Sequence, residues 1–305
     1  MRGSSARQLA GLVTGGVAAA GAACVAYGVF LERHWYRLRR ETVPVLPPGS
    51  RPLDVMHLSD LHMTARDAAK GEFLGRLAAV PADLVVVTGD MLGEPGSLDP
   101  VLGTLGRFRP RIGAVAVLGS NDYYSPRPLN YAAYFRPRRK RRRVAGRNPY
   151  RELVAALEGM GWLVLSNARG ALGGIELAGM DDPHIHREDL RVAVPPDGNP
   201  AGLRVGVVHS PYRRCLDAFE RNGYQLLLAG HTHGGQVRLP GYGALVDNCD
   251  LPLDQARGLS RWRSSWLHVS AGLGTSKYAP FRFACRPEAS LLTLTSRETG
   301  SARTR

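Results

Sequence analysis

The sequence contains little cysteine. Four of its 305 residues are cysteines, and no two of them form a C-x-x-C pair. Zinc knuckles and dithiol redox sites depend on closely spaced cysteines, so neither is indicated. The chain also shows no internal repeat of fixed period, which argues against a repeat architecture. We expect the cysteines to be small buried side chains, as free cysteines commonly are.

Acidic residues are scarce relative to basic ones. Aspartate and glutamate number 26 against 40 lysines and arginines, which gives a formal net charge of +14. Such a surface favours anionic partners, namely phosphate groups, acidic lipid headgroups or nucleic acid. Hydrophobic residues make up 44% of the chain and charged residues 22%. These fractions are typical of globular proteins and argue against disorder of the whole chain.

Charged residues are absent from Gln8 to Leu31. A helix needs roughly 20 apolar residues to cross the hydrocarbon core of a membrane, and this stretch is long enough. Trp35, Tyr36 and four neighbouring arginines suit the interface that would follow. Residues 1–40 are therefore predicted to form a membrane anchor, with residues 8–31 as its single span.

Two other interpretations of the anchor involve cleavage. A signal peptide would have a shorter apolar core. Ala22-Ala23-Cys24 resembles a lipoprotein cleavage site, but Gly21 stands where leucine is expected. No twin-arginine export pair precedes the span. Arginines flank the span on both sides, and their distribution leans slightly toward a cytoplasmic catalytic domain.

The rest of the chain is predicted to be one α/β domain behind a linker. Residues 41–52 hold four prolines and read as an extended linker. Residues 53–295 alternate short apolar runs with helix-like segments, which is typical of α/β folds. The predicted strands are 53–58, 84–87, 114–118, 203–208, 225–229 and 266–269, and the clearest predicted helices are 67–80, 149–160 and 212–221. Residues 296–305 are predicted to be a disordered tail.

A basic segment interrupts this order at residues 136–147. Eight of its twelve residues are lysine or arginine. It is interpreted as a solvated, mobile surface loop, although a nuclear-localisation or nucleic-acid patch has a similar composition. Next to a membrane anchor, we favour acidic lipids over nucleic acid as its partner, because basic clusters are attracted to acidic headgroups.

Polar side chains follow five of the apolar runs. The five clusters are Asp60-Leu61-His62, Gly89-Asp90, Gly119-Ser120-Asn121-Asp122, His209 and Gly230-His231-Thr232-His233. Carboxylate, amide and imidazole groups together suit Zn²⁺, Mn²⁺ or Fe. Open α/β sheets place their sites at the carboxyl ends of strands, where these groups stand. Each cluster alone is a weak signal, whereas the ordered set predicts a metal centre.

In this order the clusters resemble the calcineurin-like metallophosphoesterase superfamily. The segments HLSDLH, GHTHGGQVRLP and GLGTSKYAPFRFACRPE resemble a bacterial branch of membrane-linked phosphodiesterases. The resemblance covers residues 53–295 and implies a four-layer αββα sandwich, in which two mixed sheets are flanked by helices. It also implies two divalent cations, Mn, Zn or Fe, and a phosphate-ester substrate. The implied reaction is attack on phosphorus by a metal-bound hydroxide.

The resemblance also implies a distribution of ligands. Asp60, His62 and His233 would bind one cation. His209 and His231 would bind the other, together with an amide from the third cluster. Asp90 would bridge the two cations.

The third cluster departs from the family pattern, which reads Gly-Asn-His followed by an acid. Aligned without a gap, Ser120 takes the ligand position; a shift of one residue gives that position to Asn121. We favour Asn121, because an amide oxygen is the better hard donor. The histidine that assists the leaving group is missing in both alignments. Asn121 and Asp122 are therefore the candidate catalytic residues, with Asp122 as a substitute acid, and we expect a preference for good leaving groups.

Other polar residues and other functions stay open. His57 and His268 lie inside predicted strands and are interpreted as buried supporting groups. The segment Asp181-Asp182-Pro183-His184 reads as a proline turn that could approach the substrate. Besides a phosphoesterase, with a lipid-linked substrate as one candidate, the sequence allows two alternatives. One is a catalytically idle, membrane-bound protein that binds lipid or nucleic acid, and the other is a metal hydrolase of another bond, such as an amide.

Overall fold

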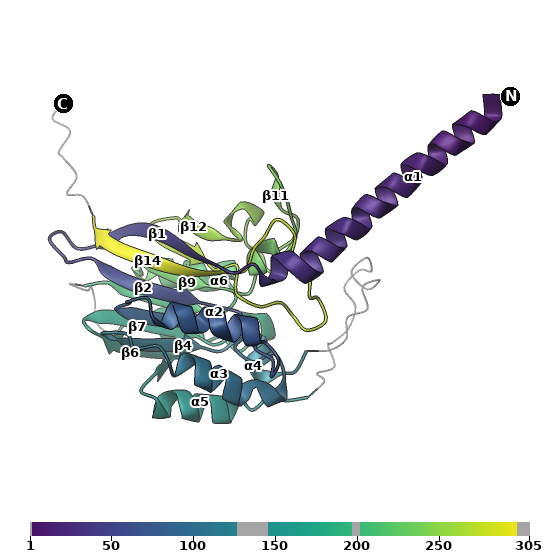
Figure 1. The fold of residues 1–305 in the computed structure, drawn as a ribbon. Coiled ribbons are helices and arrows are strands. Elements are labelled where there is room, and N and C mark those ends of the chain that lie inside the picture. Colours follow the sequence, from purple (N-terminus) through teal and green to yellow (C-terminus); the bar gives the residue numbers. More distant parts are fainter. Residues whose placement is uncertain (1, 127–145, 197–201, 298–305) are drawn as a thin grey trace, which may run out of the picture.

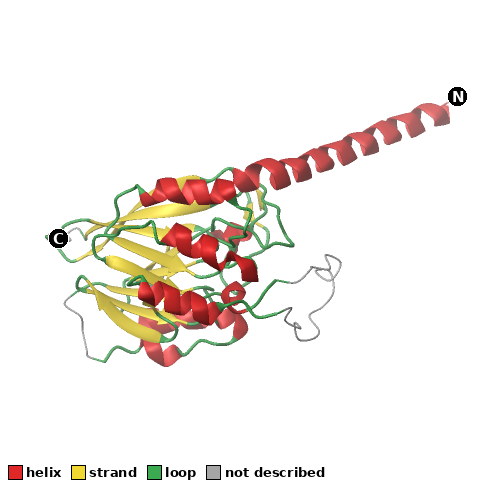
Figure 2. Ribbon diagram, turned by 60° about the horizontal axis from the view of Figure 1, so that its bottom comes forward, coloured by secondary structure: helices red, strands yellow, loops and turns green. Residues whose placement is uncertain are grey.

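Two six-stranded sheets stack face to face in the computed structural model, which describes residues 2–126, 146–196 and 202–297 (Figures 1 and 2). The first sheet has the order β1-β14-β2-β3-β4-β5, and the second β12-β13-β9-β8-β7-β6. Both are mixed: β14 runs antiparallel to β2, and in the second sheet β12–β13 and β6–β7 are antiparallel pairs. A separate short hairpin pairs β10 with β11.

The strands have the following bounds: β1 Arg37–Leu46, β2 Leu53–Leu58, β3 Leu84–Thr88, β4 Gly113–Val117, β5 Leu163–Val164, β6 Ala168–Leu172, β7 Ile175–Met180, β8 Arg204–Val208, β9 Leu226–Ala229, β10 Arg238–Leu239, β11 Gly243–Ala244, β12 Gly258–Trp262, β13 Ser265–Val269 and β14 Glu288–Ser296. The α-helices are α1 Arg2–Ala26, α2 Ala68–Ala78, α3 Leu98–Leu105, α4 Ser120–Tyr123, α5 Tyr150–Gly159 and α6 Arg213–Arg221. A π-helical turn, Tyr27–Leu31, and a 3₁₀ turn, Glu32–His34, continue α1.

Three hydrophobic cores separate four layers. One core lies between the first sheet and α2, α3 and α5, the second lies between the two sheets, and the third lies between the second sheet and α6. Neighbouring residues of one strand enter different cores, because side chains alternate across a sheet. Val86 of β3 faces the second core, whereas Val85 and Val87 face the first. Burial on both faces explains the continuous apolar runs and confirms the αββα sandwich.

The predicted strands and helices are all present, with ends shifted by one or two residues. Sequence analysis missed β1, β5, β6, β7, β10, β11, β12 and β14. Burial is uneven along β1, β6 and β12, and β5, β10 and β11 are two residues long, whereas β7 and β14 are mostly buried.

The linker prediction is wrong for residues 41–46. These residues form the second half of β1, which pairs in parallel with β14. Val43 and Val45 are buried in the core between the sheets. Pro44 is tolerated because β1 is an edge strand, where a missing N–H removes no bond of the sheet. The proline-rich composition suggested a linker, but the alternation of buried and exposed side chains in residues 41–46 is that of a strand.

The N-terminal helix projects away from the sandwich (Figure 1). Residues Leu12–His34 form the one helix, within the described part of the chain, that is long and apolar enough to cross a membrane. Its large apolar side chains face outward; Val17 is 69% exposed and Phe30 71%. The apolar surface of this helix is therefore not covered by the rest of the protein and is available for contact with lipid.

Two other predicted segments lie mostly outside the described residues. Residues 136–145 of the basic segment and residues 298–305 of the predicted tail are not described. The first two residues of that tail are ordered: Ser296 ends β14, and the Arg297 N–H donates to the Leu46 carbonyl at 2.9 Å.

Candidate metal centre

The predicted ligands stand on tight turns at the carboxyl ends of β2, β3, β4, β8 and β9. Five of them adopt a left-handed backbone conformation: Asp60 (φ 49°), His62 (40°), Asp90 (52°), His231 (68°) and His233 (50°). Residues with side chains rarely adopt this conformation unless surrounding structure enforces it, and such strain clusters at functional sites. The strain is therefore concentrated at one group of side chains.

Asp60, His62 and His233 form a first group of potential ligands. Their ligand atoms all lie within 4.8 Å of one another. The Nε2 atoms of His62 and His233 are 3.2 Å apart, and His233 Nε2 is 3.5 Å from Asp60 Oδ1. These three residues, predicted to share one cation, are thus brought together.

Asp90 and His209 form a second group with Asp60, again within 4.8 Å. His209 Nε2 lies 3.5 Å from Asp90 Oδ1, while the other oxygen, Oδ2, lies 3.5 Å from His62 Nε2. Each carboxylate oxygen of Asp90 thus faces one group. This is the geometry expected of a bridging ligand.

His231 borders the second group. Its ring centre lies 5.2 Å from that of His209, and the backbone N–H of His231 donates to Asp60 Oδ2 at 2.9 Å. On its other side it meets His184, whose ring centre is 4.5 Å away. The two aspartates and the four histidines predicted as ligands therefore lie together in one buried cluster.

Backbone carbonyls orient three of these imidazoles. A carbonyl only accepts, so the ring nitrogen that faces it carries the proton and the other nitrogen keeps its lone pair. His209 Nδ1 donates to Thr88 O at 2.6 Å and His233 Nδ1 to Gly274 O at 3.1 Å, which leaves both Nε2 lone pairs facing the centre. His231 instead directs Nε2 to Asn248 O at 3.4 Å, which leaves Nδ1.

Unsatisfied buried atoms fit a metal centre. Asp60 Oδ1 and His209 Nε2 are buried and form no hydrogen bond with any described residue. Burying polar atoms without partners is costly, and a cation between them would satisfy both. Oxygen and imidazole donors in turns also match what Zn²⁺, Mn²⁺ or Fe bind.

The protonation states fit cations as well. Burial lowers the pKa of His62 to about 4, and burial also lowers the pKa values of His231 and His233 well below the ordinary histidine value. These rings are therefore neutral, as ligands must be. Burial alone would lower the pKa of His209, but Asp90 and other nearby carboxylates hold it well above its ordinary value. A cation beside Asp90 would take the place of that proton and leave His209 as the neutral ligand that its contact with Thr88 O implies.

Asp122 lies beneath the centre. Its Oδ1 accepts from the N–H groups of Met91 and Leu92, and its Oδ2 from those of Asp90 and Gly119, all within 2.8–3.0 Å. Burial, followed by the charge of Asp90, raises its pKa to about 7. Since both oxygens are occupied by backbone donors, the geometry favours a role in holding two turns together over direct contact with a leaving group.

Asn121 approaches the bridging carboxylate. Its backbone N–H donates to Asp90 Oδ1 at 2.7 Å, and its side-chain Nδ2 donates to Asp90 Oδ2 at 2.6 Å. A half-turn of the carboxamide would present its oxygen to a cation bound at Asp90. Its own carbonyl is held by Asn148 Nδ2 at 2.5 Å.

Sequence analysis did not single out Arg282, which is fully buried. Its Nη2 donates to the carbonyls of Ala271 and Gly274, each at 2.7 Å, and Gly274 O is the partner of His233. The guanidinium thus fixes the segment that orients a ligand. Arg282 lies in the motif GLGTSKYAPFRFACRPE, which was a usable signal, but the motif alone did not reveal which side chain turns inward.

The turn at Asp181–His184 reaches the centre. His184 Nδ1 lies 3.1 Å from the Tyr212 hydroxyl, and its ring faces His231. Asp182 is buried and accepts from Ser210 Oγ at 2.7 Å, next to His209. The turn therefore forms one wall of the site.

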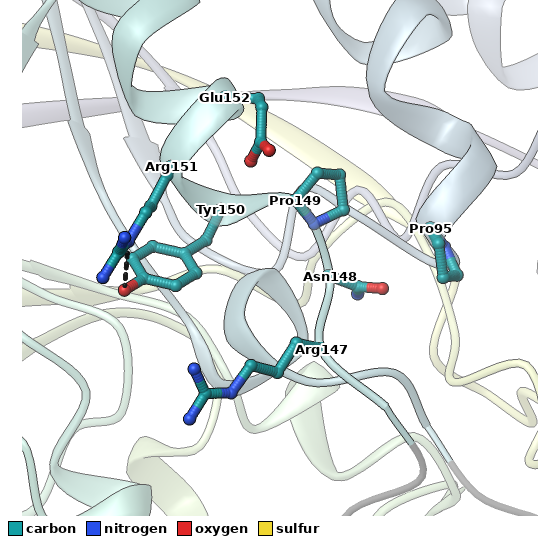
Figure 3. Close-up of a pocket in the computed structure, with 7 residues that line it drawn as sticks. All are labelled: Pro95, Arg147, Asn148, Pro149, Tyr150, Arg151 and Glu152. Atoms are coloured by element: carbon teal, nitrogen blue, oxygen red, sulfur yellow. Dashed lines mark hydrogen bonds between the residues drawn. The ribbon is translucent and has the colours of Figure 1, made fainter.

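A cavity of about 460 Å³ opens next to the third cluster (Figure 3). Its lining includes Asn148, the partner of Asn121, with Arg147 and Arg151 around Tyr150. None of the predicted ligands lines it. The cavity borders the centre without containing it.

The calcineurin-like phosphoesterase family matches residues 53–235, a segment that holds every predicted ligand. The chain belongs to this family. It is 26% identical over 249 residues to the uncharacterized metallophosphoesterase YkoQ of Bacillus subtilis (strain 168), covering 79% of this chain and 83% of YkoQ. It is 24% identical over 283 residues to the phosphodiesterase YaeI of Escherichia coli (strain K12), covering 88% of this chain and 92% of YaeI. These matches identify the metallophosphoesterase as a metal-dependent phosphoric ester hydrolase.

A third relative is named as a transmembrane protein that contains this domain. The metallophosphoesterase is 27% identical over 216 residues to a bovine (Bos taurus) transmembrane protein with metallophosphoesterase domain, covering 64% of this chain and 44% of that protein.

Proposed function

We propose that this metallophosphoesterase hydrolyses phosphodiester or phosphomonoester bonds at a centre of two divalent cations. The observation that carries the proposal is the placement of Asp90, with one carboxylate oxygen toward His62 and the other toward His209. A bridging carboxylate between two imidazole-bearing groups is suited to two cations rather than one.

In this proposal Asp60, His62 and His233 hold one cation, and His209, His231 and Asn121 hold the other. Two cations at such a centre supply charge for the phosphoryl oxygens and lower the pKa of a coordinated water. The chain orients the ligands of these cations. Thr88 O and Gly274 O fix the rings of His209 and His233, while Asp122 and Arg282 fix the turns. Burial excludes bulk water, which strengthens each of these electrostatic contacts.

The leaving group receives little help from the third cluster. Asn121 cannot transfer a proton near neutral pH, and the carboxylate of Asp122 is engaged by four backbone donors. Because general acid catalysis typically contributes 10²–10⁴-fold, we infer that esters with good leaving groups are preferred.

The same proposal ties the enzyme to a membrane. Residues 8–31 form a single span, with the catalytic domain on the cytoplasmic side and the basic segment 136–147 near acidic headgroups. The apolar, exposed face of α1 and the bovine relative's printed name support membrane association. A lipid-linked phosphate ester is the substrate class that this placement favours.

Metal content and turnover test the proposal together. Full-length protein in detergent should bind about two cations per chain and hydrolyse bis-p-nitrophenyl phosphate. Asp90→Ala should lose both, because each cation loses a shared ligand. Metal without turnover would favour the catalytically idle binding protein, and the absence of both from the parent would refute the phosphoesterase. Turnover of amide substrates alone would favour a hydrolase of another bond.

A further inference from the structure

The hairpin of β10 and β11 carries an exposed apolar patch. We call residues 238–246 the apolar hairpin. Its exposed side chains are Leu239 (46%), Tyr242 (75%), Leu245 (43%) and Val246 (60%). An isolated two-stranded hairpin has no core of its own, so these side chains do not stabilise it from within. Contiguous exposed apolar surface of this kind marks a contact with a partner or a membrane.

The apolar hairpin is linked through Phe283 to the end of the membrane helix. The Arg238 N–H donates to Phe283 O at 2.9 Å, and the Phe283 ring meets the Tyr27 ring edge-on with centres 6.2 Å apart. The helix packs so closely here that a Cβ on Gly28 would overlap the Phe281 ring. β11 rises from the end of the molecule where α1 leaves it (Figure 1). The hairpin and the helix end are therefore held side by side.

The residues at the helix end are of the types found at the membrane interface. The proposed span, residues 8–31, ends about one helical turn after Tyr27, which places Tyr27 close to the headgroups. Trp35 is 55% exposed, and the Arg286 guanidinium lies 4.0 Å from the centre of its ring. Tryptophan, tyrosine and arginine are the residues typical of this interface.

The apolar hairpin also borders the metal centre. A Cβ on Gly235, two residues after His233, would lie 2.5 Å from the Cβ of Ala244 in β11. Shortly after the hairpin, Asn248 O receives His231 Nε2 at 3.4 Å. The apolar hairpin is therefore linked through Phe283 to the helix end, it packs against the turn that carries His233, and the residues that follow it reach His231.

We propose that the apolar hairpin inserts into the headgroup region of the same bilayer that α1 crosses, so that the metal centre faces the membrane surface and acts on a phosphate ester carried by a lipid. This rests on the proposed function for the substrate, but the position of the hairpin is independent of catalysis. Two contacts with one bilayer, the span and the hairpin, fix the orientation of the catalytic domain where a span alone would allow it to rotate.

A spin label locates the hairpin. Full-length Tyr242→Cys carries a nitroxide in vesicles of phosphatidylcholine and phosphatidylglycerol, with Met160→Cys as the matched control. Met160 is 40% exposed and directly follows α5, a helix on the side of the molecule away from α1 (Figure 1). The unsubstituted chain gives the background from its native cysteines. The label at 242 should be more accessible to oxygen than to a water-soluble nickel chelate, and the label at 160 the reverse.

Two results would overturn the placement of the hairpin. One is equal access of the nickel chelate to both labels. The other is a dipolar coupling between labels at 242 in two copies, which would identify a self-association surface instead.

A second measurement tests the substrate class. In the same vesicles, the triple variant Leu239→Asn, Tyr242→Ser, Val246→Thr should lower hydrolysis of a lipid-borne p-nitrophenyl phosphodiester by about tenfold relative to soluble bis-p-nitrophenyl phosphate, because orientation at the surface is lost. Met160→Gln should leave the ratio unchanged. An unchanged ratio in the triple variant contradicts the lipid substrate. A parent inactive on both substrates refutes the proposed function, while the spin label still decides where the hairpin lies.

Discussion

Single residues in the metal centre are held in conformations that they would not adopt alone. Asp60, Asp90 and His231 have positive φ angles although none of them is glycine. Close contacts leave no room to relax: a Cβ on Gly230 would overlap Ser59 Oγ and lie 2.6 Å from Asp60 Oδ2. At this scale the neighbouring glycines matter because they let the ligands approach one another.

Gly230→Ala should therefore abolish the first cation site without unfolding the protein. The added methyl group would displace Ser59 and the Asp60 carboxylate, so metal content should fall to at most one cation per chain. Gly103→Ala is the matched control, because nothing lies within 4 Å of that position in α3. The control should be neutral or stabilising by about 0.5–1 kcal/mol. Metal analysis and thermal unfolding measure both effects, and full metal content in Gly230→Ala would contradict the argument.

Asn121 and Ser120 are distinguished by a second pair of substitutions. Asn121→Ala removes the side chain that contacts Asp90 Oδ2 and should weaken binding of the second cation by roughly 10-fold or more. Ser120→Ala, whose side chain is half exposed, should retain parental affinity. Titration of the apo-protein with Mn²⁺ provides the comparison. The reverse order of affinities would assign the ligand to Ser120.

At the scale of elements, two buried histidines join the two sheets. His57 Nδ1 of β2 lies 2.8 Å from His268 Nδ1 of β13, and His57 Nε2 lies 2.9 Å from Thr88 Oγ1. Both rings are fully buried. Burial lowers the pKa of His268 to about 3 and holds that of His57 well below its ordinary value. The contact between the sheets therefore depends on neutral imidazoles.

This pair predicts a loss of stability in acid. Between the lowered folded value, about 3 for His268, and the ordinary histidine value of 6.5, the unfolded chain binds protons that the folded chain does not. The free energy of unfolding should therefore fall as the pH drops below 6.5. His268→Gln removes one titrating group and should reduce that slope by an amount that grows as the pH falls and approaches about 1.4 kcal/mol per pH unit near pH 5. Denaturant unfolding of the two proteins from pH 7 to pH 5 measures it, and equal slopes would exclude the pair as a source.

At the scale of the whole molecule, the apolar helix is connected to the αββα domain by ordered, hydrogen-bonded residues rather than by a flexible hinge. Glu32, at the end of the helix, is buried and accepts the backbone N–H groups of Ala284 and Cys285 at 2.9 and 2.6 Å. Arg282, in the same segment, reaches the carbonyl that orients His233. The anchor and the metal centre are thus connected through one loop.

Membrane extraction tests the anchor at this scale. The full-length protein should stay in the membrane fraction at about 1 M salt, which screens surface charge, and should be released by detergent. Val13→Arg combined with Val17→Arg should shift it to the soluble fraction, because each central arginine costs about 2.5–3.5 kcal/mol of insertion free energy. Val194→Arg, at a position 53% exposed on the sandwich, is the control and should stay membrane-bound. Release of the parent by salt alone would contradict a spanning helix.

Much of the fold follows from periodicity in the sequence. Continuous apolar runs such as Leu84–Val87 predict strands buried on both faces, and the structure has this one as β3, Leu84–Thr88. β1 was missed because Pro44 suggested a linker, and only pairing with β14 shows that the position is an edge. The weaker strands β6 and β12 carry exposed residues and give no clear signal.

The sequence by itself determined which carboxylates and imidazoles come together, because they follow apolar strands in a fixed order and strand ends meet at one edge of a sheet. Only the tertiary structure showed which hydrogen bonds the side chains in and around the centre form. Asp122 accepts four backbone N–H groups from two turns, and Arg282 is buried and donates to the carbonyl that orients His233. The physical reason is that the positions of the strands along the chain follow from local hydrophobicity, whereas strand order in the sheets and hydrogen-bond partners depend on segments far apart in the chain.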